Sequence, residues 1–164
     1  MINFFKKLRE DEVKLMYKGP TLVTVLIAGA DDRIDNKEIK EAIEFTKLGQ
    51  SKGKNLMVDF YKEIAETFEH DLKELIHTLP EDAEARNPVI VEELRRLNII
   101  LPKLDRQFAI QYYESMQEIA SAVAKASGGI LGYMSVGFEE ARYVDLNFIR
   151  NPARYKKPEA KPGI

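Results

Sequence analysis

The chain has 164 residues, of which 45% are hydrophobic and 32% are charged, and this balance is typical of a soluble globular protein. Its length favours one domain with a substantial core. It contains no cysteine, which excludes disulfides, thiolate catalysis, zinc–thiolate sites and iron–sulfur ligation. No apolar run approaches the roughly 20 residues that span a bilayer. The first residues also lack the order of a signal peptide, so we expect a cytoplasmic protein without a transmembrane segment.

The formal net charge of −2 is unevenly distributed along the chain. Residues 150–164 contain five basic residues against one glutamate, a net charge of +4, which leaves −6 for the rest. An acidic body argues against a nucleic-acid-binding face, which needs clustered Lys and Arg. The basic segment also holds three prolines and little apolar content. We therefore predict a single domain over residues 1–149 and a disordered tail over 150–164.

Nearly every segment of the domain has helical periodicity, and none alternates as a strand does. Residues 1–19 are expected to form a helix, from about Asn3 to Lys18, whose aromatic-rich face docks on the domain. Gly19 and Pro20 should end it, and Pro20 suits the first turn of the next helix. The expected helices cover residues 3–18, 20–28, 35–49, 55–79, 88–97, 104–127 and 135–148.

These patterns predict an all-α compact bundle of about seven helices. The long helix over 55–79 carries its apolar residues at helical spacing, so that one face turns inward. A short internal repeat, in which residues 25–34 align with 121–130, favours two pseudo-symmetric halves.

Four carboxylates fall within eight residues at the junction of two expected helices: Asp31, Asp32, Asp35 and Glu38. Asp35 and Glu38 have the spacing of a capping box, at a helix N-terminus where the dipole favours negative charge. Asp31 and Asp32 come just after a helix C-terminus, whose last carbonyls lack intrahelical partners. Carboxylates beside free carbonyls are the ligand set of a hard cation such as calcium. We therefore predict these four residues as candidate metal ligands.

A second interpretation of this segment needs no metal. Arg33 and Lys37 could neutralise the carboxylates, which would leave a capped and solvated turn between helices. The register is not that of an EF-hand. With Glu38 as the twelfth loop position, the first and third would be Ile27 and Gly29, which offer no side-chain oxygen.

The same residues resemble a known family. Ala30-Asp31-Asp32-Arg33-Ile34-Asp35-x-x-Glu38-Ile39 is similar to the Ala-Asp-Gly-x-Ile-x-x-x-Glu signature of the TerB family, named for tellurite resistance. Leu101-Pro102-Lys103-Leu104 and residues 124–132, with a later Glu-Glu, resemble the C-terminal half of TerB-like proteins. The resemblance covers about residues 20–148. It implies an all-helical domain with two related halves, a non-enzymatic role, and acidic residues that bind cations such as calcium, here the four carboxylates.

The sequence departs from that family at two points. Asp32 replaces the glycine of the family's loop, and the second half has Ser127 and Gly128 where the first has its Asp pair. We therefore expect one cation site rather than two.

A polar pattern on the helix over 55–79 is a second candidate metal site. Glu74 and His77 have the spacing of a di-iron ligand pair, and His70 lies four residues before Glu74. A di-iron centre needs two such pairs and two further Glu on other helices, and this chain has only these two histidines. We therefore predict a solvated polar face here.

Taken together, these observations predict a non-enzymatic TerB-like protein that binds calcium or another divalent cation. It would act as a sensor or scaffold in a stress-response or membrane-associated complex, with a protein partner and no nucleic acid. One alternative is a purely structural interaction domain without metal. A second is a metal-dependent enzyme that uses the acidic turn, which would need a pocket, an open metal position and a general base.

Overall fold

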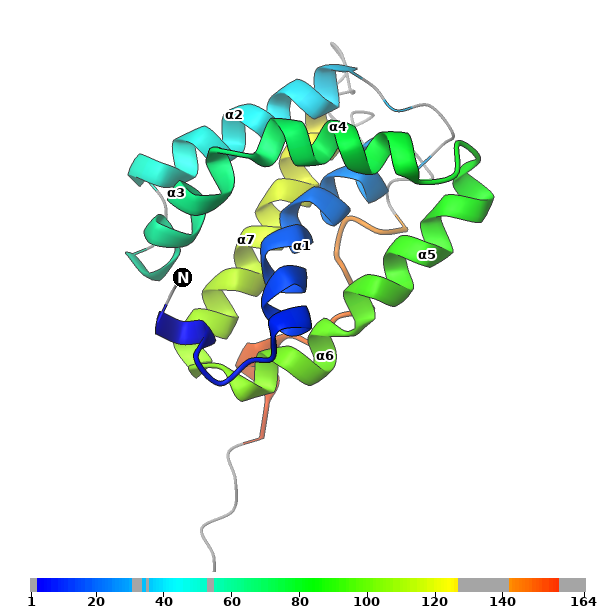
Figure 1. Cartoon of the computed structure of the whole chain (residues 1–164). Helices are drawn as coiled ribbons and strands as arrows, with labels where there is room; N and C mark the ends of the chain where they lie inside the picture. The colour runs from blue at the N-terminus through cyan, green and yellow to red at the C-terminus, as the bar shows by residue number, and fades with distance from the viewer. Residues whose placement is uncertain (1–2, 31–33, 35, 53–54, 127–141, 157–164) are drawn as a thin grey trace, which may run out of the picture.

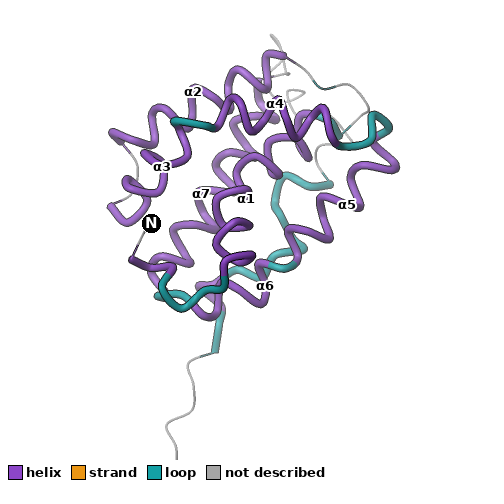
Figure 2. Tube along the Cα trace, in the orientation of Figure 1, coloured by secondary structure: helices purple, strands orange, loops and turns teal. Residues whose placement is uncertain are grey.

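The computed structural model describes residues 3–30, 34, 36–52, 55–126 and 142–156. Within these ranges every regular element is a helix, and no strand occurs (Figure 2), so the predicted all-α bundle is confirmed. None of the helices described is both long and apolar enough to cross a membrane. The elements are η1 Asn3–Phe5, α1 Glu10–Ala28, α2 Asn36–Lys52, η2 Asn55–Met57, α3 Val58–Ala65, α4 Phe68–Thr78, α5 Ala83–Arg95, α6 Leu97–Ile100, η3 Leu101–Lys103, α7 Arg106–Ala126 and η5 Pro152–Arg154.

The centre of the bundle is formed by α1 and α7, which pack against each other and are surrounded by the remaining helices (Figure 1). Every residue of α1 from Gly19 to Ala28 is buried. This explains why that stretch is apolar around its whole circumference rather than on one stripe. The flanking helices, by contrast, each bury one face and expose the other.

An aromatic cluster attaches the N-terminal turn to this centre. The ring of Phe5, which is completely buried, meets Phe60 and Phe108 edge-on at centroid distances of 6.3 and 5.6 Å. Phe4 stacks on Phe108 at 4.7 Å. Such pairs add roughly 0.5–1.5 kcal/mol each beyond the burial of their area. The aromatic residues of η1 therefore fix the start of the chain against α3 and α7.

The predicted helix boundary at Gly19–Pro20 is wrong, because α1 runs unbroken from Glu10 to Ala28 with Pro20 inside it. A proline lacks the N–H that would bond the carbonyl four residues earlier, here that of Met16. The hydroxyl of Tyr112, on α7, donates to the Met16 carbonyl at 2.9 Å and takes the place of the missing donor. A Cβ on Gly19 would overlap that hydroxyl, so Gly19 leaves the room that Tyr112 needs.

The single helix predicted over 55–79 is divided in the structure into η2, α3 and α4, with a break at Glu66 and Thr67. The apolar face expected for this segment nevertheless turns inward, since Phe60, Phe68 and Leu72 are buried. The break has a packing reason. α3 lies mainly along α2, whereas α4 also packs on α1 (Figure 1), and one straight helix would not follow both directions.

Two other boundaries also differ from the prediction. α2 continues to Lys52, through part of the loop expected over 50–54. α5 begins at Ala83 rather than at Pro88, which lies inside the helix. The carbonyl that loses its donor to Pro88 belongs to Glu84, an exposed residue where water can supply the bond.

The C-terminal part of the chain differs most from the prediction. Residues 142–148 of the helix expected over 135–148 form turns, with Leu146 buried at a positive φ of 51°, and residues 127–141 lie outside the described ranges. Of the tail expected over 150–164, residues 150–156 include η5, which packs on α7 with Pro152 buried, and residues 157–164 lie outside the described ranges. The second copy of the internal repeat runs into the undescribed residues, so the two-half symmetry stays a prediction.

Candidate functional site

The acidic corner, by which we mean residues 28–38 between α1 and α2, contains the four predicted metal ligands. Asp31, Asp32 and Asp35 lie outside the described residues. Glu38 lies in the first turn of α2 and is only 2% exposed. A carboxylate in the first turn is stabilised by the positive end of the helix dipole. The structure therefore places one of the four carboxylates, and it places it in the interior.

The C-terminal end of α1 is held by a buried arginine from α5. The side chain of Arg86 is 1% exposed, and its guanidinium donates to the carbonyl of Gly29. It also donates to the carbonyl of Glu81, at 2.8 Å, just before α5 begins. Next to it, the Asn87 amide donates to the carbonyl of Ala30 at 3.5 Å. One charged side chain therefore joins the end of α1 to the start of α5, across 57 positions of sequence.

This contact explains the glycine at the end of α1. Gly29 has an ordinary negative φ of −106°, so its role is not to permit a left-handed turn. A Cβ on Gly29 would instead lie 2.5 Å from a guanidinium nitrogen of Arg86. α1 ends at Ala28, where the sequence predicted a helix end, and Gly29 follows it because this position must leave space for a side chain from another helix.

Arg86 also changes the electrostatics expected for the corner. The last carbonyls of α1 are expected from the sequence to be free ligands for a cation, yet the Gly29 carbonyl already accepts from Arg86. Arg33 and Lys37 are the neutralising charges that the sequence indicates. The buried guanidinium is a further positive charge, fixed at the chain position two residues before Asp31. Sequence reasoning missed Arg86 because its partners are distant in sequence and it was assigned to a loop before Pro88.

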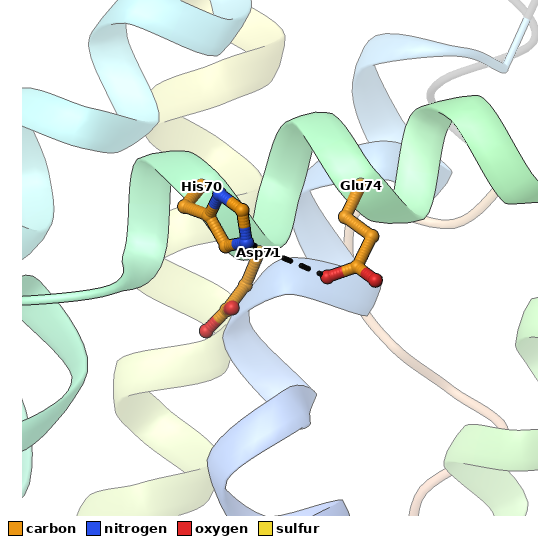
Figure 3. A group of neighbouring side chains, drawn as sticks. All are labelled: His70, Asp71 and Glu74. Carbon is orange, nitrogen blue, oxygen red and sulfur yellow. Dashed lines mark ion pairs between the residues drawn. The ribbon is translucent and has the colours of Figure 1, made fainter.

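A second polar group lies on the outer face of α4. His70, Asp71 and Glu74 are all exposed, and one ligand atom of each lies within 4.8 Å of the others (Figure 3). His70 Nε2 is 3.7 Å from Glu74 Oε2, with 81% and 67% of the two side chains exposed. Such exposure agrees with the solvated polar face predicted from the sequence. Within the described residues this is a group with metal-ligand spacing, but all its members are open to water.

Beside this group, a cavity of about 380 Å³ lies between α1 and α4. Its charged lining residues are mixed in sign, with Lys14 and Lys18 from α1 facing Asp71 and Glu74 from α4. Opposite charges in equal number produce no strong field for a charged ligand. The chemistry of this cavity therefore does not single out one class of ligand.

No family model, curated protein or solved structure matches this chain. The resemblance to TerB-like proteins thus continues to rest on the motifs quoted above.

Proposed function

We propose that this protein is a non-enzymatic TerB-like domain that acts as a sensor or scaffold, and that its acidic corner responds to a divalent cation such as calcium. In this proposal the partner is another protein, in a stress-response or membrane-associated complex. The protein would respond by changing the rigidity of the corner rather than by catalysing a reaction.

The observation that carries the proposal is the position of Arg86. Its bonds to the carbonyls of Gly29 and Glu81 make the corner a junction of α1 and α5, and α2 starts from the same segment. A cation held by the Asp residues between α1 and α2 would act on all three helices at once. The corner carries four carboxylates against Arg33, Lys37 and the adjacent Arg86, so a divalent cation would still be attracted.

The same arginine favours a second candidate, an interaction domain that binds no metal. A guanidinium bonded to the end of α1 already supplies positive charge there, so the corner would be stable without calcium. A cation-sensitive scaffold and a metal-free scaffold differ in one measurable property, which is calcium binding. A metal-dependent enzyme at the corner is the least supported of the three, because it would further need a general base beside the carboxylates.

The test is a calcium titration by calorimetry on chelator-treated protein. We expect saturable binding near one equivalent in the wild type and none in Asp31→Asn/Asp35→Asn. The matched control is Asp59→Asn/Glu92→Gln, which removes two exposed carboxylates on α3 and α5 and should bind like the wild type. Calcium should also raise the melting temperature, by a free energy that grows as RT ln(1 + [Ca]/Kd).

The possible results separate the candidate functions and the location of the cation. Absence of binding at millimolar calcium would reject the cation sensor and leave the metal-free scaffold. Equal binding in both double variants would place the cation elsewhere, with the group on α4 as the next site to alter. Metal-dependent turnover of any substrate would contradict a non-enzymatic role.

A further inference from the structure

A polar cavity of about 410 Å³ lies where residues 145–154 cross α7. One wall is α7, and the other is the C-terminal strap, by which we mean residues 142–156, drawn in orange to red in Figure 1. The polar side chains of its lining that matter here are Tyr113, Gln117, Asp145, Arg150, Asn151 and Arg154. Its volume is in the range of small-molecule sites, which are about 300–1,000 Å³.

The strap is fixed in place by side chains of the helices beneath it. The Asn98 amide donates to the Phe148 carbonyl at 2.9 Å, and its oxygen accepts from the backbone N–H of Arg150 at 2.7 Å. The Gln117 amide donates to the Asp145 carbonyl at 3.1 Å. Between these points Leu146 is completely buried with a positive φ, a conformation that costs energy and persists only when its surroundings impose it. The cavity wall is therefore preorganised.

The lining of this cavity includes two arginines. Among the described residues, neither the Arg150 nor the Arg154 guanidinium forms an ion pair. Arg150 lies over the ring of Tyr155 at 5.4 Å from the centroid, which orients a guanidinium but leaves its charge and its N–H groups available. Asp145 is the acidic residue of the lining, so two positive charges face one negative charge. The cavity therefore has a net positive charge.

Two neutral groups add hydrogen-bond donors to the arginines. Tyr113 is 5% exposed, and its hydroxyl oxygen accepts from the Gln117 amide at 3.1 Å, which leaves its proton to donate. Burial raises the pKa of the Tyr113 phenol, with Arg154 opposing this effect and Asp145 adding to it, so the proton is present at neutral pH. The Asn151 oxygen accepts from the Ala153 N–H at 2.9 Å, and its NH₂ group is the remaining donor.

We propose that this cavity binds the phosphate group of a small phosphorylated molecule. Arg150 and Arg154 would bond the phosphate oxygens, since a guanidinium fork matches their geometry. The Tyr113 hydroxyl and the Asn151 NH₂ complete a donor set larger than the two oxygens of a carboxylate require, whereas a phosphate group offers three strong acceptor oxygens. Asp145 would accept from a hydroxyl or amine elsewhere on the ligand.

The experiment is an NMR titration of the full chain with inorganic phosphate and with glycerol 3-phosphate, at a constant ionic strength of about 150 mM. We expect saturable shifts of the amides around residues 113–117 and 145–155. Glycerol 3-phosphate should bind more tightly than phosphate, because Asp145 can accept from its hydroxyl groups. Arg150→Gln and Arg154→Gln should each weaken binding by about tenfold or more, as loss of a charge-assisted bond does.

The controls separate a site from general attraction to a basic surface. Arg95→Gln removes an exposed arginine of α5 and should leave the affinity unchanged. Tyr113→Phe keeps the ring and removes only the hydroxyl, and it should weaken phosphate binding about three- to tenfold. Unchanged melting temperatures in the arginine variants would show that the strap is still in place.

Three results would overturn the proposal. The first is the absence of saturable shifts up to ten-millimolar phosphate, about the affinity of a weak site. The second is equal weakening by Arg95→Gln and by the two cavity variants. The third is tighter binding of acetate or citrate than of glycerol 3-phosphate, which would make the cavity a carboxylate site. None of these results depends on calcium or on the acidic corner.

Discussion

At the scale of single residues, Arg86 is a buried charge that joins two helices. A charged side chain that is 1% exposed is costly to bury unless it is hydrogen-bonded, and here both terminal nitrogens of the guanidinium bond carbonyls, at the end of α1 and before the start of α5. The bond to Gly29 supplies a donor at the C-terminal end of α1, where the last carbonyls of a helix lack intrahelical partners. Arg86 therefore acts as a cap for one helix while belonging to another.

Replacing Arg86 with Met should destabilise the protein strongly. Methionine keeps most of the volume but donates no hydrogen bond, so the Gly29 and Glu81 carbonyls would lose their donors. An unsatisfied buried group costs about 1–3 kcal/mol, and we expect a loss on the order of 3 kcal/mol in the free energy of unfolding. Urea denaturation measures it. Arg95→Met, at an exposed position of the same helix, is the control, and equal losses in the two variants would show that Arg86 has no special role.

At the scale of elements, the continuity of α1 depends on a residue of α7. Pro20 removes one backbone donor, and the Tyr112 hydroxyl replaces it by reaching Met16 through the space above Gly19. The hydroxyl of Thr24 also bonds the Pro20 carbonyl, at 2.8 Å, within the next turn. A sequence that signals a helix end is thus converted into a helix interior by tertiary contacts.

Gly19→Ala should destabilise the protein, although alanine is the better helix former by about 1 kcal/mol. The new methyl group would displace the Tyr112 hydroxyl and leave the Met16 carbonyl unbonded. We expect a net loss of roughly 1–3 kcal/mol, as for other overpacked positions.

A double-mutant cycle identifies the cause. Tyr112→Phe removes the overlapping hydroxyl, so Gly19→Ala should cost much less in that background than in the wild type. Equal costs in both backgrounds, by denaturant titration, would contradict the argument, and so would a stabilising Gly19→Ala.

These elements show how far sequence reasoning reaches. Helical periodicity identified α7 and the inward residues Phe60, Phe68 and Leu72, because those depend on spacing within one segment. The continuation through Pro20 depends on Tyr112, 96 positions away, and no local pattern contains it. For the same reason the carboxylates of the corner could be selected from their spacing, whereas Arg86, and the burial of Glu38, could not.

At the scale of the whole molecule, a buried carboxylate links the start of α1 to the region between α6 and α7. The side chain of Glu12 is 2% exposed and accepts from the ammonium of Lys103 at 2.7 Å. The Lys103 hydrogen bond, followed by the bond from the Arg9 backbone N–H, holds the pKa of the Glu12 carboxyl below its usual value. The pKa of this carboxyl in the unfolded chain is about 4.3. Because the folded pKa is lower, the ionised carboxylate stabilises the folded protein at pH values above the unfolded pKa.

This contribution should disappear in acid. As the pH falls below about 5 and through the lowered pKa, Glu12 becomes protonated and its stabilising effect is lost. Thermal midpoints measured from about pH 7 to about pH 3 should fall less steeply in Glu12→Gln than in the wild type. The control is Glu10→Gln, two residues before Glu12. The Glu10 side chain is 87% exposed in its pair with Lys14, so this variant should keep the wild-type slope. Parallel curves for all three proteins would show that Glu12 does not contribute to the pH dependence of stability.

The bond between Tyr112 and Met16 also affects the order in which the helices are completed during synthesis. During synthesis α1 emerges long before α7. Until then the Met16 carbonyl must bond water, because the Tyr112 hydroxyl that later donates to it has not been made. The first helix made is therefore among the last to be completed. Contacts between residues so distant in sequence form slowly. Until α7 packs on α1, the apolar stretch from Gly19 to Ala28 lacks one of its main packing partners. We therefore expect chaperones to bind a nascent chain that is paused before residue 106.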